Sequence, residues 1–544
     1  MPTVAQFLME RLEPLVDDVF GIPGDYILAF YDQLDKKFNV IGTTDEQCAG
    51  FAADAYARVR GFGVVCVTYC VGGFKLLNPI ACAYAEKSPV LVISGAPGVK
   101  ERSSGLLLHH AAGPFGCQRK VFQNVTCASA VLDDPNWAGY EVDRVIDAIQ
   151  YHKQPGYIEI PRDMVNTNIR YDVYSQGTPS SDHGDTENLN EAIEKSIEWI
   201  KQSEHPVVLA GVEMARYGFG EELIKFAERN NIPVATTILG KSVISEHNSH
   251  CLGIYAGAMS HDDVREIVET SDCVLQLGVM QTDMNMAFQP FQCNRTNVIF
   301  ASTGRVRVRR STYEHVSFQE FVTGLLRVEL SKKKQRSSIE VSHDRRGGFI
   351  VEKGRPVTAE RLFHKINEVI DKDTAIIADV GDCLFGAADL RVHYHNQFLA
   401  PAFYTSMGNA LPGALGVQTA LPDIRPIVLV GDGAFQMTGM EVSTIVRRGL
   451  NPVIFVLNND GYGTERCLGV DGQYNDLQRW GYHKVPEVVG GGVGYLVETE
   501  DELDAAVGAA LANKKSASII NVILDKMDVT PALRRMTDSL KHSV

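Results

Sequence analysis

The sequence predicts an α/β protein of three doubly wound domains with mainly parallel sheets. Short apolar runs rich in β-branched residues alternate with helical stretches almost throughout, which is the pattern of parallel strands covered by helices on both faces. A chain of 544 residues is too long for one hydrophobic core. Two polar stretches, at 171–188 and 331–355, interrupt the alternation. We interpret them as linkers that divide the chain into three blocks.

The first block, residues 1–175, contains five predicted strands and two predicted helices. The strands are short apolar runs at 16–20, 40–43, 64–68, 90–94 and 157–160. The helices occupy 46–60 and 73–86. Because each helix lies between two successive strands, we expect those strands to pair in parallel through crossover helices.

The second and third blocks show the same alternation of predicted strands and helices. The second, 189–335, is predicted to start with a helix at 189–201, followed by strands at 206–211, 232–237 and 273–278. It offers few polar candidates for catalysis, so we expect a structural or regulatory domain. The third, 355–544, is predicted to contain a helix after Pro356, strands at 375–378, 427–430 and 452–457, and a helix at 441–448.

Composition and charge narrow the class of protein. With 45% hydrophobic and 22% charged residues, the chain has the composition of a soluble globular protein. Its net charge of −15 argues against a nucleic acid or an anionic membrane as partner. The N-terminus lacks the features of a signal peptide, and no apolar run is long enough for a membrane helix. Eleven cysteines without CxxC pairs indicate free thiols. We therefore expect a cytoplasmic protein.

One motif in the third block indicates a metal and phosphate site. Asp432 lies between two glycines after the predicted strand 427–430, and Asn458-Asn459 follow the strand 452–457. Open α/β sheets bind ligands at such strand ends. Carboxylate and amide oxygens suit Mg²⁺, and glycines let backbone N–H groups approach a diphosphate. The alternative is an ordinary glycine-rich turn before a helix. The motif resembles the metal and diphosphate signature of thiamine diphosphate enzymes.

Further segments extend this resemblance along the chain. In order they read FGIPGDY, TTDEQCAGFAADAYARVRG, TYCVGG, AYAEKSPVLVISGAP, GLLLHH and GDG with NNDGYGTE. Together they resemble the thiamine diphosphate-dependent 2-oxo acid decarboxylases, the group of pyruvate, indolepyruvate and phenylpyruvate decarboxylases. The resemblance is weakest in the middle block. It implies the thiamine diphosphate-binding fold, with a pyrimidine-binding first domain and a diphosphate- and Mg²⁺-binding third domain.

The resemblance also implies a set of catalytic residues. Glu46 would hydrogen-bond the ring nitrogen N1′ of the cofactor, although an acid at a helix start is common for reasons of charge alone. The others are Asp25, His109, His110 and Glu465. Without the family context, a histidine pair is more often part of a surface turn. Two histidines and two carboxylates can move protons near neutral pH.

Contacts to the cofactor and the metal follow from the same resemblance. Asp432, Asn459 and Gly461 would hold Mg²⁺. Residues expected to contact thiamine diphosphate are Glu46, Asp382, Met407, Asp432, Gly433, Ala434, Asn459 and Gly461. Met407 would support the bent shape of the cofactor. Ala434 stands where many relatives have serine, so one hydroxyl contact to the diphosphate is expected to be absent.

Two positions bear on the substrate. At Leu384 and Thr464, family members that prefer pyruvate typically carry the larger tryptophan and isoleucine. Smaller side chains imply a roomier pocket, and each buried methylene contributes about 0.8 kcal/mol. The sequence thus predicts a preference for longer, branched or aromatic 2-oxo acids.

The assembly and the rival functions are also part of the prediction. In this family the site forms between the first domain of one subunit and the third of another, so a homodimer is the smallest active unit and homotetramers are common. One alternative is a carboligase of the same cofactor class, which forms an acyloin or an acetohydroxyacid. Another is a catalytically silent regulatory paralogue, which would not need the full acid/base set. A nicotinamide dehydrogenase is disfavoured because no GxGxxG joins a strand to a helix.

Overall fold

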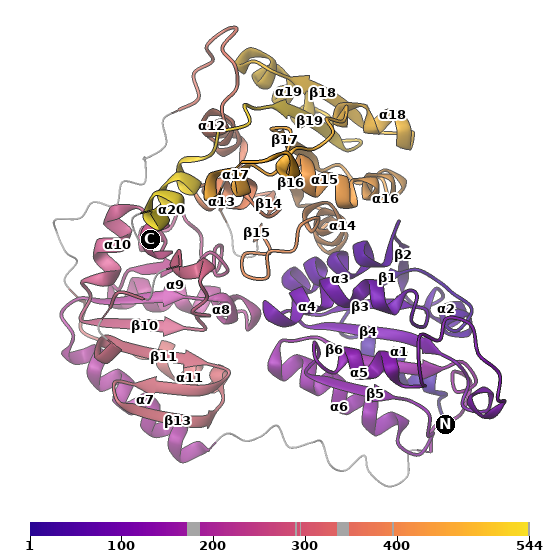
Figure 1. Cartoon of the computed structure of the whole chain (residues 1–544). Coiled ribbons are helices and arrows are strands. Elements are labelled where there is room, and N and C mark those ends of the chain that lie inside the picture. Colours follow the sequence, from indigo (N-terminus) through magenta and orange to yellow (C-terminus); the bar gives the residue numbers. More distant parts are fainter. Residues whose placement is uncertain are drawn as a thin grey trace. The chain divides into compact units, whose positions relative to one another are not determined.

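The computed structural model describes residues 1–170, 185–288, 291–293, 295–333, 348–393, 397–469 and 471–541. Most of both predicted linkers, at 171–184 and 334–347, lies outside these residues. Three sheets flanked by helices confirm the predicted α/β class with mainly parallel sheets (Figure 1). The described residues form two compact units. The first takes in the described parts of Met1–Ser181, Leu411–Ile424 and Thr438–Leu450, and the second takes in those of Asp182–Ala410, Arg425–Met437 and Asn451–Val544.

The first unit contains a six-stranded sheet in the order β2-β1-β3-β4-β6-β5, with every neighbouring pair parallel. Its strands are β1 (Asp18–Gly21), β2 (Asn39–Gly42), β3 (Gly63–Val67), β4 (Val90–Ala96), β5 (Ala128–Val131) and β6 (Gly156–Pro161). The five predicted strands are confirmed. Strand β5 was not predicted, because this short edge strand reads Ala-Ser-Ala-Val and lacks the bulk of a typical apolar run.

The helices of the first unit include α1 (Val4–Leu12), α2 (Leu28–Leu34), α3 (Glu46–Arg60), η1 (Gly73–Leu76), α4 (Leu77–Ala85), α5 (Cys117–Phe122) and α6 (Ala138–His152). Helix α3 has the predicted bounds. The Asp45 side chain caps its start by accepting from the Gln47 N–H, and Gly61 ends it at a φ of 89°. The predicted helix at 73–86 is instead a 3-10 turn, η1, followed by α4.

The second unit contains a seven-stranded sheet in the order β13-β12-β11-β10-β7-β8-β9. Its strands are β7 (Pro206–Ala210), β8 (Val234–Thr236), β9 (Cys251–Ile254), β10 (Cys273–Leu277), β11 (Val298–Ser302), β12 (Gly304–Val308) and β13 (Ser311–Val316). The pairs β11–β12 and β12–β13 are antiparallel. Strands β9, β11, β12 and β13 were not predicted. Strand β12 reads Gly-Arg-Val-Arg-Val and alternates polar with apolar residues rather than forming an apolar run.

A second sheet of this unit has six parallel strands in the order β15-β14-β16-β17-β19-β18. The strands are β14 (Thr374–Ala378), β15 (Phe398–Leu399), β16 (Arg425–Gly431), β17 (Val453–Asn458), β18 (Val493–Val497) and β19 (Ser518–Ile523). The three predicted strands of this block are confirmed as β14, β16 and β17. Gly431 of β16 pairs with Leu457 of β17, so the residues that follow the two strands leave the sheet at the same edge.

Helices flank both sheets of the second unit: α7 (Thr186–Gln202), α9 (Gly220–Asn230), α10 (Asp262–Glu269), α11 (Phe318–Leu326), α12 (Ala359–Val369), α13 (Asp382–Ala388), α15 (Asp432–Thr438), α17 (Gly463–Leu468), α19 (Glu500–Ala512) and α20 (Pro531–Lys541). Helix α7 begins inside the predicted linker, because the Asp185 side chain accepts from the N–H groups of Glu187 and Asn188. The predicted helix at 441–448 is α16 (Val442–Arg447), which belongs to the first unit. Of the described helices, none is long and apolar enough to cross a membrane.

Candidate active site

The edge where β16 and β17 end presents a buried carboxylate. Asp432 is the first residue of α15 and is only 2% exposed. Its Oδ1 accepts from the Gly433 N–H at 2.7 Å, and its Oδ2 accepts from the Gly461 N–H at 2.9 Å. Burial raises the pKa of Asp432 to about 6. A bound cation would offset the cost of burying this charge.

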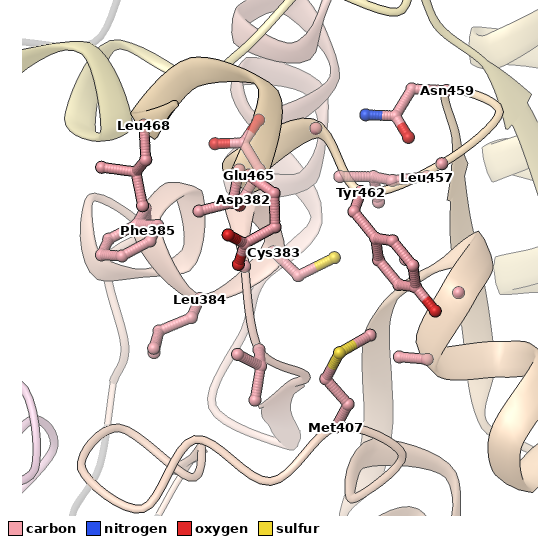
Figure 2. A pocket seen from close by; sticks show the side chains of 18 of the residues that line it. Asp382, Cys383, Leu384, Phe385, Met407, Leu457, Asn459, Tyr462, Glu465 and Leu468 are labelled. Carbon is pink, nitrogen blue, oxygen red and sulfur yellow. The ribbon is translucent and has the colours of Figure 1, made fainter. Parts of the chain in front are cut away.

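Asn459 and Gly461 lie on the loop that follows β17. Asn459 (Figure 2) lines a cavity. Asp432 lines the same cavity. Asn458 is instead completely buried and donates its Nδ2 to Asn521 Oδ1 at 3.1 Å. Gly461 has a φ of 147°, and a Cβ there would lie 1.9 Å from the backbone oxygen of Asn475. Only glycine therefore fits at this position, and the structure brings the three predicted metal ligands to one edge of the sheet.

The cavity at this edge has a volume of about 220 Å³. All the site residues predicted in the third block line it: Asp382, Leu384, Met407, Asp432, Gly433, Ala434, Asn459, Gly461, Thr464 and Glu465. Figure 2 shows Met407 and Asn459 among the side chains around this space. An apolar cavity with a few convergent polar groups is typical of a cofactor or substrate site. A buried acid, an amide and close-packed glycines suit a divalent cation with a diphosphate.

Several lining residues were missed by the sequence analysis. Met284 and Phe288 come from the second block, and Met536 comes from α20. Phe385 and Leu468 complete the apolar wall beside Leu384 (Figure 2). No local sequence pattern indicates that Met284, Phe288 and Met536 belong to the site, because they reach the cavity only through the tertiary fold.

Asp382, an expected cofactor contact, has its side chain bound to Thr530. It lines the cavity at the start of α13, but its Oδ2 accepts from the Thr530 N–H at 2.9 Å and its Oδ1 from the Thr530 hydroxyl at 2.5 Å. Asp389, which caps the other end of α13, accepts from Arg535 Nη2 at 2.9 Å. Both ends of α13 are thus bound to the segment that forms α20 and carries Met536.

Asp379 is a further buried acid that the sequence analysis missed. It follows β14 directly, as Asp432 follows β16. An acid directly after an apolar strand is a sequence pattern from which this residue could have been predicted. Its carboxylate accepts from the N–H groups of Val380 at 2.9 Å, Gly408 at 3.0 Å and Ala410 at 2.9 Å. Burial raises its pKa to about 6. Asp379 therefore fixes the turn that carries Met407.

Replacing Asp379 by alanine is expected to destabilise the protein by about 3 kcal/mol or more, because each buried N–H left without a partner costs about 1–3 kcal/mol. The midpoint of thermal unfolding measures the effect. The Asp379→Asn variant keeps one acceptor oxygen in a side chain of the same shape. Its unfolding midpoint should therefore lie between those of the wild type and of Asp379→Ala. An unfolding midpoint for Asp379→Ala equal to that of the wild type would contradict this role.

In the first unit, Asp25, His109 and His110 form one cluster. His109 Nε2 lies 2.6 Å from Asp25 Oδ2, and His110 Nε2 lies 3.8 Å from Asp25 Oδ1. His109 stacks on the Tyr26 ring with centroids 4.6 Å apart. His110 has a φ of 63°, a left-handed conformation that is uncommon outside glycine. This backbone lets two adjacent histidines turn toward the same carboxylate.

Glu46, also in the first unit, is the first residue of α3 and is 8% exposed. Its Oε2 lies 3.1 Å from Lys75 Nζ. The turn before it is fixed by the buried Glu441, whose Oε2 accepts from the Thr44 N–H at 3.0 Å and from the Thr44 hydroxyl. The predicted site residues thus form two sets, one in each unit.

Comparison with known proteins supports this picture. Three family models of thiamine pyrophosphate (thiamine diphosphate) enzymes match in order: the N-terminal TPP binding domain over residues 2–127, the central domain over 193–327 and the C-terminal TPP binding domain over 379–522. The fold and the three matched domains therefore define a thiamine diphosphate enzyme.

Similar proteins of full length carry more specific names. An indole-3-pyruvate decarboxylase of Azospirillum brasilense is 32% identical over 96% of this chain and 95% of its own length. Alpha-keto-acid decarboxylases of Mycobacterium ulcerans and Mycobacterium tuberculosis are 31% and 30% identical, each over 99% of this chain and 96% and 97% of their own lengths. The chain belongs to the family of thiamine diphosphate-dependent 2-oxo acid decarboxylases.

Proposed function

We propose that the protein decarboxylates a 2-oxo acid without oxidation, releasing an aldehyde and CO₂, with thiamine diphosphate and Mg²⁺. The observation that carries this proposal is the buried Asp432 carboxylate, which accepts a hydrogen bond from the Gly461 N–H and lines an apolar cavity. The names of the relatives agree with it. When bound, thiamine diphosphate supplies the electron sink that lets the bond to the carboxylate carbon break.

The residues of the second unit would hold the cofactor and the metal. Asp432, Asn459 and the backbone carbonyl of Gly461 offer Mg²⁺ the oxygen ligands that it prefers. The backbone around Gly433 and Ala434 would face the diphosphate. Because Ala434 has no hydroxyl, the diphosphate must be held by the backbone and the cation.

The acids and histidines would manage protons. Glu46 would hydrogen-bond N1′ of the cofactor. The Asp25–His109 hydrogen bond fixes the orientation of an imidazole that would exchange protons with the substrate. His110 and Glu465 would complete the set that holds the substrate carboxylate and delivers a proton to the product. Met407 would support the cofactor, and Asp382 would contribute its backbone, since its carboxylate is occupied by Thr530.

We also propose a substrate preference from the wall of the cavity. Leu384 is fully buried and lines the cavity together with Thr464, Phe385, Leu468 and Met536. These side chains leave an apolar wall without a tryptophan. Such a wall favours longer, branched or aromatic 2-oxo acids over pyruvate.

This preference predicts that kcat/KM rises from pyruvate to 2-oxoisovalerate and phenylpyruvate, by roughly fourfold for each additional buried methylene. Steady-state assays with the three substrates measure it. The Leu384→Trp variant is a matched control that narrows the pocket and should shift the preference toward pyruvate. If the wild type clearly favours pyruvate, the proposed preference is wrong.

The domain boundaries, the assembly and the location complete the proposal. We place the pyrimidine-binding domain at 1–175, the middle domain at 189–335 and the diphosphate- and Mg²⁺-binding domain at 355–544. In support, each of the three sheets lies within one of these ranges. The family resemblance supports a homodimer as the minimal active unit and a homotetramer as the assembly. The composition supports a cytoplasmic location.

A further inference from the structure

Lys75 places one ammonium group between two carboxylates next to the proposed cofactor-activating acid. Its Nζ lies 2.6 Å from Asp45 Oδ2 and 3.1 Å from Glu46 Oε2. The Lys75 side chain is 53% exposed, whereas that of Glu46 is 11% exposed. Lys75 lies on η1, just after the TYCVGG segment, and no role was predicted for it.

The two oxygens of the Glu46 carboxylate have different surroundings. Among the residues that the structure describes, Lys75 is its only ion-pair partner. On the other side, Gly72 packs so closely that a Cβ there would lie 3.1 Å from Glu46 Oε1. A ligand that approaches Glu46 therefore meets a carboxylate that is already partly neutralised by an ammonium group.

We infer that Lys75 competes with thiamine diphosphate for the carboxylate of Glu46, and that Asp45 retains the ammonium when the cofactor binds. This inference rests on the proposed function, in which Glu46 hydrogen-bonds N1′. A ring nitrogen that gains a proton there is a second cation beside the same acid, and like charges repel. Because Asp45 lies nearer to Lys75 than Glu46 does, the ammonium has an alternative partner in place. Lys75 would thus be a positioning residue that acts through Glu46.

Substitutions of Lys75 and of Asp45 are expected to change the affinity for thiamine diphosphate in opposite directions. Lys75→Met removes the competitor but keeps the length of the side chain, so the Kd for thiamine diphosphate should fall by roughly two- to fivefold, the range of a partly exposed ion pair. Asp45→Asn removes the alternative partner, so the Kd should rise by a similar factor. Asparagine caps helices about as well as aspartate, so α3 should be preserved.

The experiment is a calorimetric titration of the cofactor-free full-length protein with thiamine diphosphate at saturating Mg²⁺. Lys75→Arg keeps the charge and should retain the wild-type Kd. Lys37→Met is a matched control, since Lys37 pairs with the distant Glu13 in the same unit. In a Glu46→Gln background the effect of Lys75→Met should disappear, which a merely structural role would not produce.

The outcomes are distinct. A Kd for Lys75→Met that is unchanged or higher, or a shift of the same size in the Glu46→Gln background, would overturn the role of Lys75 and leave the proposed function standing. A wild-type protein that does not bind thiamine diphosphate with Mg²⁺ would overturn the proposed function together with this inference.

Discussion

Replacing Glu46 by glutamine is expected to lower kcat by roughly 10²–10⁴-fold, the range of a positioned acid/base group. Glutamine keeps the shape and the burial of the side chain at the start of α3, but it cannot share a proton with N1′. The fold and Mg²⁺ binding should be retained. Aldehyde release measures turnover, and circular dichroism with thermal unfolding measures the fold.

A matched control for this variant is Glu13→Gln, which changes an exposed acid of the same unit and should leave kcat unchanged. Turnover of the Glu46→Gln variant at the wild-type level would show that Glu46 does not activate the cofactor. In that case the assignment of the first block as the pyrimidine-binding domain would lose its main functional support.

The second large effect is expected at the metal site. Asp432→Ala should weaken the Mg²⁺-dependent binding of thiamine diphosphate by about 100-fold or more, because even residues that only orient metal ligands contribute about 10–100-fold. The variant also loses the acceptor for the Gly461 N–H, which positions the loop after β17. Calorimetric titration with the cofactor in the presence of Mg²⁺ measures the loss.

Asp423→Ala provides the control, since Asp423 is exposed and lies just before β16, whereas Asp432 follows that strand. It should bind the cofactor like the wild type. Cofactor binding by Asp432→Ala with an unchanged Kd would contradict the proposed metal and diphosphate site.

The parts of the fold that local chemistry determines were predicted well. The bounds of α3 follow from Asp45 as an N-cap and Gly61 as a left-handed C-cap, both visible in the sequence. The central strands β16 and β17 are fully apolar in their middle, so their position was equally clear. Their adjacent pairing confirms that Asp432 and Asn459 leave the same edge of one sheet.

The parts that depend on tertiary contacts were not predicted. Strand β12 alternates arginine with valine, so it lacks the continuous apolar run of a buried strand. Met284, Phe288 and Met536 reach the cavity only because distant segments fold around it. The carboxylate of Asp382 binds Thr530, a contact between residues that are far apart in sequence. No local pattern could have indicated it.

The most direct test of the proposed function is an aldehyde-release assay over a panel of 2-oxo acids, with and without thiamine diphosphate and Mg²⁺. The proposed function predicts free aldehyde and an equal amount of CO₂ only when both thiamine diphosphate and Mg²⁺ are present, with higher kcat/KM for longer or aromatic substrates. An acyloin as the main product would indicate a carboligase, and cofactor binding without any product would indicate a silent paralogue. Either result would contradict the proposed decarboxylation.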